Sequence, residues 1–132
     1  MHGFSRNTII TARIIIGQFD YINVRENDIV TELRWQSIHQ RRDYFTACLM
    51  FKCLNSAAPI HLTNEITLVS EIHNVNTRFS QDDNVHVPRP NSELFKKSFR
   101  YHGATIWNAL PAELKQAQNI HDFKILYKEF YF

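Results

Sequence analysis

The sequence contains very little glycine: only three glycines are scattered along 132 residues. A phosphate-binding loop needs several glycines in one short segment, and a nucleophile elbow needs them on both sides of its serine or cysteine. Neither arrangement occurs in this chain. The sequence therefore predicts neither a nucleotide-binding loop nor a hydrolase nucleophile, and we do not expect an independent enzyme.

Cysteine is also scarce, with only Cys48 and Cys53. On one helix, side chains five residues apart lie about 140° apart around the axis, so a disulfide between them would distort the helix. We interpret both as small buried hydrophobic residues in a reducing compartment. No Cys-x-x-Cys is present, and the histidines do not pair at zinc-site spacing, so we expect no metal and no cofactor.

The excess of positive charge is small as well. A formal net charge of +2 excludes a histone-like polycation, although a local basic face remains possible. No segment approaches the roughly 20 apolar residues that cross a bilayer. Arg13 interrupts the apolar N-terminal run, and no small-residue cleavage site follows it. We therefore expect an intracellular protein with no membrane partner.

Aromatic and aliphatic residues are abundant by contrast. Hydrophobic residues make up 44% of the chain, and they include ten phenylalanines and five tyrosines. This composition is typical of a globular protein and predicts an aromatic-rich core, although some of the rings can instead face a partner. The length fits a single domain over residues 1–132, or a domain fragment of a larger protein.

The spacing of apolar residues predicts a mostly α fold, a helical bundle-like domain. Residues 7–17 are β-branched and apolar, which fits either a buried strand or a helix, and Gly17 ends the segment in both cases. A short helix is predicted over residues 23–35. Ser37 is then predicted to cap the central buried helix over residues 38–55, which is apolar nearly all round in its second half.

The C-terminal third also has helical spacing. Apolar residues form a possible stripe from Phe95 to Leu110, although Gly103 weakens its middle. Pro111 stands where a new short helix would begin. Asn119 can cap the last helix, which we predict over the remaining residues.

Residues 67–90 separate these helical regions and are polar and short-patterned, which predicts a short irregular β-hairpin or extended segment. Within it, Asp82 and Asp83 are similar to the adjacent aspartates with which polymerases hold divalent cations. Phe79 lies one position too early for that motif, and no nearby strand supplies a third acid. We interpret the pair as a solvated turn.

Two basic groups are the candidate nucleic-acid contacts. The first comprises Arg41, Arg42 and Lys52, and the second comprises Arg89, Lys96, Lys97 and Arg100. Aromatic residues alternate with the second group, and lysine and arginine release counterions from a nucleic-acid backbone when they bind its phosphates. Spacing alone fits equally a solvated helix face whose aromatic residues point into the core.

The stretch YHGATIWNALP has the composition of a structural corner. A buried tryptophan beside an asparagine suggests that the asparagine satisfies backbone groups, and a proline prevents the preceding helix from continuing. The residues that carry this prediction are Tyr101, Gly103, Trp107, Asn108, Leu110 and Pro111.

Several segments, taken in order, resemble the C-terminal tail of reverse transcriptases encoded by non-LTR retrotransposons of the jockey and chicken-repeat type. The recurrent WN-x-LP phrase of that family matches residues 107–111. The other matching segments are FDYINV (19–24), LRWQSIHQRRDYF (33–45), MFKCLNSAAPIHL (50–62), NTRFS (76–80), VPRPNSELFKKSFRYHGATI (87–106) and NIHDFKILYKEFYF (119–132).

The resemblance implies a large polypeptide with an endonuclease domain, then fingers, palm and thumb, and then this thumb-side or post-thumb region. None of the catalytic aspartates of the palm has a counterpart in the matched residues, and the endonuclease has none either. The resemblance therefore implies a non-catalytic region that supports the thumb and contacts template–primer nucleic acid. Its partners would be element RNA, target DNA and the upstream polymerase core, in the nucleus or in a cytoplasmic ribonucleoprotein.

Two other functions remain open at the level of sequence. Exposed aromatic residues and the apolar N-terminus would also suit a protein-interaction or dimerisation module. The third possibility is that the reading frame is a decayed transposon copy with no selected function.

The second basic group leads to a testable prediction. Replacing Lys96, Lys97 and Arg100 with alanine should weaken binding of RNA or duplex and reduce its dependence on salt, because fewer counterions are released. Unchanged binding in a salt titration would assign these residues to surface solubility.

Overall fold

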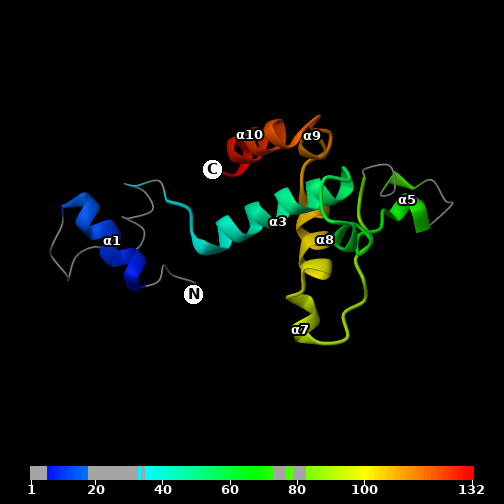
Figure 1. Ribbon diagram of the computed structural model, residues 1–132, viewed down its shortest axis with the longest axis horizontal. Helices are drawn as coiled ribbons and strands as arrows, with labels where there is room; N and C mark the ends of the chain where they lie inside the picture. The colour runs from blue at the N-terminus through cyan, green and yellow to red at the C-terminus, as the bar shows by residue number, and fades with distance from the viewer. Residues whose placement is uncertain (1–5, 18–32, 34, 73–76, 79–82) are drawn as a thin grey trace. The chain divides into compact units, whose positions relative to one another are not determined.

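The computed structural model describes residues 6–17, 33, 35–72, 77–78 and 83–132 of the chain. Eight helices lie in these residues, and the prediction of a mostly α fold is confirmed (Figure 1). The chain forms two compact units, Met1–Asp43 and Tyr44–Phe132, whereas sequence analysis treated residues 1–132 as one domain or domain fragment. Each unit is described by itself below.

In the first unit, the apolar N-terminal segment is a helix, α1 (Arg6–Ile16), which settles the choice between strand and helix. Gly17 ends it with a φ of +73°, a left-handed conformation that favours glycine. Ile14 and Ile15 are exposed on α1. The short helix predicted over residues 23–35 falls largely outside the described residues.

The central helix α3 (Ile38–Leu54) begins with the predicted cap. The hydroxyl of Ser37 accepts a hydrogen bond from the backbone N–H of Gln40, and the side chain of Gln40 accepts one from the backbone N–H of Ser37. This reciprocal pair satisfies two N–H groups that a helix start leaves open. At the other end, Ser56 adopts a positive φ and the chain turns away before Pro59.

The core of the second unit is an aromatic stack between three helices. Phe51 of α3 lies 4.8 Å, between ring centroids, from Phe123 of α10 (Ile120–Tyr131), and Trp107 of α8 (Phe99–Ala109) stacks on Phe123 at 6.1 Å. Met50 is fully buried with them. A Cβ atom at Gly103 would lie 2.9 Å from the Met50 sulfur, so this glycine permits close approach of α8 to α3.

The Trp107–Asn108 pair forms the predicted corner. The indole N–H of Trp107 donates to the Asp83 carbonyl at 2.9 Å. The Asn108 side-chain oxygen accepts from the Val85 N–H at 2.8 Å, while its side-chain NH₂ donates to the Val85 carbonyl at 2.8 Å. One asparagine thus satisfies both backbone groups of a buried residue. Neighbouring residue Leu110 is buried and Tyr101 is half-buried.

The helix end is the other half of this corner. Leu110 leaves the helical conformation with a ψ of 145°, and Pro111 stands directly before α9 (Ala112–Lys115) as predicted. Asn119 caps α10, because its side-chain oxygen accepts a hydrogen bond from the Asp122 N–H at 2.9 Å.

Two predictions about element boundaries need correction. The stripe predicted from Phe95 to Leu110 is two helices, α7 (Glu93–Lys96) and α8, because the Ser98 hydroxyl accepts from the Tyr101 N–H and caps a new helix. Ser92 caps α7 in the same manner.

The hairpin predicted over residues 67–90 is reduced, within the described part of that segment, to one antiparallel bridge between Leu68 and Val85. The chain becomes helical directly after the bridge, in α5 (Val69–Ile72), and the Glu71 carboxylate accepts from the Leu68 N–H at its start. Another short helix, α4 (Ile60–Thr63), precedes it. Asp83 occupies a turn with a φ of +51°, while Asp82 lies outside the described residues.

Among the described residues, no helix combines the length and the apolar character needed to cross a membrane.

The corner gives a prediction about stability. Asn108→Ala should lower the free energy of unfolding of the second unit by about 2–4 kcal/mol, because it leaves the buried N–H and carbonyl of Val85 without partners. Urea denaturation in a Trp35→Phe background, where Trp107 is the remaining fluorophore, measures this. Asn64→Ala, at an exposed position, is the matched control and should change stability by less than about 0.5 kcal/mol. Equal effects of both substitutions would contradict the assigned role of Asn108.

Candidate nucleic-acid interface

All seven cations predicted from sequence to contact nucleic acid have exposed side chains: Arg41, Arg42, Lys52, Arg89, Lys96, Lys97 and Arg100. Arg41 and Arg42 belong to the first unit, where the Arg42 guanidinium lies 3.1 Å from the ring nitrogen Nδ1 of His39. The other five belong to the second unit and are held by three different helices and a loop.

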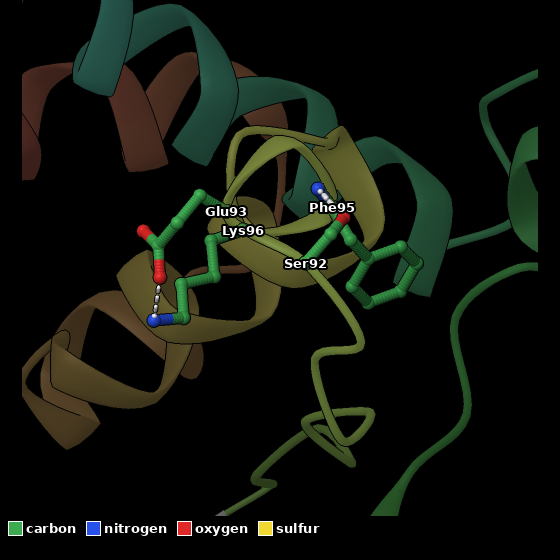
Figure 2. A network of polar contacts seen from close by, with 4 residues as sticks. All are labelled: Ser92, Glu93, Phe95 and Lys96. Carbon is green, nitrogen blue, oxygen red and sulfur yellow. Dashed lines mark hydrogen bonds and ion pairs between the residues drawn. The ribbon is translucent and has the colours of Figure 1, made fainter.

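Carboxylates already balance part of the positive charge of the second predicted basic group, which comprises Arg89, Lys96, Lys97 and Arg100. Figure 2 shows the Lys96 ammonium donating to the Glu93 carboxylate, one turn away on α7, at 2.6 Å. This hydrogen bond lowers the pKa of Glu93 and raises the pKa of Lys96. The Ser92 hydroxyl accepts from the Phe95 N–H in the same turn, which fixes the backbone that carries the pair (Figure 2). The charge of Lys96 is therefore offset locally.

Arg100 is offset in the same way, since its guanidinium lies 3.5 Å from the Glu65 carboxylate. The aromatic residues interleaved with this group are half-buried: Phe99 packs against the core, and Phe95 lies 6.4 Å from Tyr101, edge to face. The basic group on α7 and α8 thus offers Lys97 and Arg89 as cations outside the observed ion pairs, with little exposed ring surface nearby.

A different basic cluster lies on α3 and α10. Lys52 on α3 and Lys124 and Lys128 on α10 are all exposed, and the positive charge of each lowers the pKa of the Cys48 thiol, so all three lie within electrostatic range of that residue. Lys128 also lies over the Tyr44 ring, 5.8 Å from its centroid, within the range of a cation–π contact. None of the three makes an ion pair with a carboxylate among the described residues. We call Lys52, Lys124 and Lys128 the lysine face.

Sequence analysis included Lys52 in a basic group but missed Lys124 and Lys128. Those two stand four residues apart and so share one side of α10, a signal that the sequence does contain. Their proximity to Lys52 depends on the antiparallel packing of α10 on α3, in which Tyr44 contacts Tyr127 at a ring distance of 5.4 Å. No local pattern could indicate that contact.

The Cys48 thiol at the centre of the lysine face is buried. Burial raises its pKa, and this effect outweighs the hydrogen bond with Tyr44 and the three lysine charges, which act in the opposite direction. Burial also raises the pKa of Tyr44, and the neighbouring thiol adds to the shift. At neutral pH the thiol is therefore protonated, and the face carries only the positive charge of its lysines.

Other chemistry has less support in the described residues. No three histidine, cysteine, aspartate or glutamate side chains come together there in a way that could hold a metal ion. Asp83 is exposed, and its carbonyl serves as a structural acceptor for Trp107. What the second unit presents is a cationic surface beside aromatic rings, which suits a polyanion.

No protein-family model, curated protein or solved structure matches this chain.

The buried thiol gives a prediction about pH. Below its ordinary pKa of 9.0, Cys48 is protonated in both the folded and the unfolded chain. Above this pH the unfolded thiol ionises first, so folding stability should fall by up to about 1.4 kcal/mol per pH unit until the folded pKa is reached. Urea denaturation between pH 8 and about pH 10 should show a smaller loss of folding stability for Cys48→Ala than for the unchanged chain. An identical loss of stability in both proteins would contradict the raised pKa of Cys48.

Proposed function

We propose that this chain is a non-catalytic C-terminal region of a non-LTR retrotransposon reverse transcriptase, and that its second unit helps to hold template–primer nucleic acid beside the polymerase thumb. The observation that carries the binding role is the lysine face. Three exposed cations from two distant segments lie there within electrostatic range of Cys48, with no carboxylate paired to them among the described residues. Support for the family comes from the ordered series of matching segments, whose WN-x-LP phrase folds into a well-defined corner.

Binding would begin with the phosphates. Each lysine that approaches a phosphate displaces condensed counterions, which favours association and makes it sensitive to salt. Lysine is well suited to this role as a mobile point charge that needs no fixed geometry. The contacts would fix the position of the strand without reading its sequence. Element RNA and target DNA, held by the upstream polymerase core, would be the partners of this surface.

The second basic group, Arg89, Lys96, Lys97 and Arg100, would contribute less to the affinity for nucleic acid than the lysine face. Its ion pairs are exposed and individually weak, so a phosphate could replace Glu93 or Glu65. The carboxylates would nevertheless remain nearby and repel the strand. Removing three cations from the lysine face should therefore weaken nucleic-acid binding more than removing three from the second basic group.

A second candidate function is supported by a specific observation in the first unit. Helix α1 exposes Ile10, Ile14 and Ile15, with exposed fractions of 43%, 62% and 59%. A run of exposed isoleucines of this kind favours contact with another protein chain. The upstream polymerase core is the partner that the resemblance suggests.

The proposal predicts a ranking of two triple variants. Lys52→Ala, Lys124→Ala and Lys128→Ala together should weaken binding of a short RNA–DNA hybrid by about tenfold or more at moderate salt. The slope of log affinity against log salt should become shallower by about two to three. The triple variant of Lys96, Lys97 and Arg100 removes the same formal charge and should have a smaller effect.

Fluorescence anisotropy over a salt series measures both variants, with circular dichroism as the check that each remains folded. Saturable binding that is unaffected by the triple substitution on the lysine face would refute this role. Absence of binding by the folded chain would favour the protein-interaction function instead.

A further inference from the structure

We propose that the lysine face and the rings beside it bind a single-stranded segment of nucleic acid, with bases stacked on Phe45 and Tyr131 and phosphates on the lysines. This inference rests on the proposed nucleic-acid role and adds the form of the ligand. It concerns a surface that we define as the lysine face together with Phe45 and Tyr131.

Phe45 is unusually exposed for a large apolar residue on a core helix. Sequence analysis predicted that α3 is buried nearly all round in this region, and the structure corrects that prediction. The neighbours Tyr44 and Ala47 are buried, but 59% of Phe45 is exposed. Its ring leans on Tyr44 at a centroid distance of 5.2 Å and leaves most of its own surface to solvent. Tyr131 on α10 is 41% exposed in a similar way.

Helix geometry places rings and cations in the same rows. Phe45 and Lys52 are seven residues apart, about two turns, and so share one side of α3. On α10, Lys124, Lys128 and Tyr131 are separated by four and three residues and also share one side. Contacts join the two rows: Phe45 and Lys128 both lie against the Tyr44 ring, and Tyr44 contacts Tyr127, which in turn contacts Tyr131.

Buried rings support this surface from beneath. Tyr44 contacts both Phe45 and Tyr127, and Tyr127 in turn lies 4.6 Å from Tyr131, measured between ring centroids. The exposed rings are thus extensions of a packed aromatic network and not isolated side chains on a loop. A supported ring loses little freedom when a base stacks on it, which favours binding.

The combination of exposed rings with lysines favours a single strand over a duplex as the ligand. In a duplex the base faces are stacked on each other, so an exposed protein ring would gain nothing beyond the phosphate contacts. In a single strand the bases are free to stack on aromatic side chains while cations follow the backbone. The lysines argue against a protein partner, because lysine is depleted at protein–protein interfaces. Asp122 and Glu129, the carboxylates of α10, form no ion pair with Lys52, Lys124 or Lys128 among the described residues.

The test uses the full chain and three fluorescent ligands of equal length: a single-stranded RNA, an abasic strand with the same phosphates, and an RNA–DNA hybrid. Phe45→Ala should weaken binding of the single strand by about fivefold or more, because the substitution removes the ring on which one base stacks. Its binding of the abasic strand and of the hybrid should change by less than about twofold, because the phosphate contacts remain. Phe45→Trp should retain the affinity for the single strand, whereas Phe45→Leu should not.

Leu94→Ala is the control. This side chain is 79% exposed on α7, a helix that contributes no residue to the lysine face. It should leave all three affinities unchanged. An equal loss in the Phe45 and Leu94 variants would overturn the proposal, because it would indicate a general effect of surface hydrophobicity.

The inference can fail separately from the proposed function. If all three ligands bind through the lysine face but Phe45→Ala has no selective effect on the single strand, the nucleic-acid role stands and the stacking role falls. If no ligand binds, both fall together. If Phe45→Leu preserves the affinity for the single strand, apolar contact is sufficient and base stacking is refuted.

Discussion

The hydrogen bonds between Asn108 and Val85 hold the second unit together at its most irregular point. The chain around Val85 has left its helices, and its backbone groups are buried where water cannot reach them. Asn108 satisfies both groups of Val85, and Trp107 donates to the carbonyl of Asp83, two positions before Val85. Since Trp107 is also part of the aromatic core, these two adjacent residues connect the long irregular segment to the helices.

The aromatic core determines where the charged residues meet. Large rings at Phe51, Phe123 and Tyr127 pack α10 against α3 in antiparallel orientation, and this packing brings Lys124 and Lys128 toward Lys52. Like charges repel each other, but the three lysines are exposed to water, where the repulsion of even two charges about 4 Å apart would be only about 1 kcal/mol. The same exposure leaves the charges available to a polyanion.

The two basic surfaces differ in how their charges are balanced. On α7 and α8 the acidic partners are Glu93, three residues before Lys96, and Glu65, from the loop between α4 and α5, so Lys96 and Arg100 are paired within the fold. On α3 and α10 the balancing partner is absent from the described residues, and the Cys48 thiol stays protonated because it is buried. A surface with unbalanced charge and exposed rings has a stronger physical reason to bind a ligand than one with internal pairs. A count of lysines and arginines does not reveal this difference, because it does not show which of them are paired with carboxylates.

The amino-acid sequence by itself determined the helical class, the caps at Ser37 and Asn119, and the split of the 95–110 stripe at Ser98. These features depend on neighbours within a few residues, such as a side chain that accepts from the N–H group three positions later. Tertiary structure alone decided three things. It gave Trp107 and Asn108 their partners Asp83 and Val85, reduced the expected hairpin to a single bridge, and assembled the lysine face beside an exposed Phe45. Each of these depends on which distant segment satisfies a backbone group or covers a ring, and spacing along the chain carries no information about that choice.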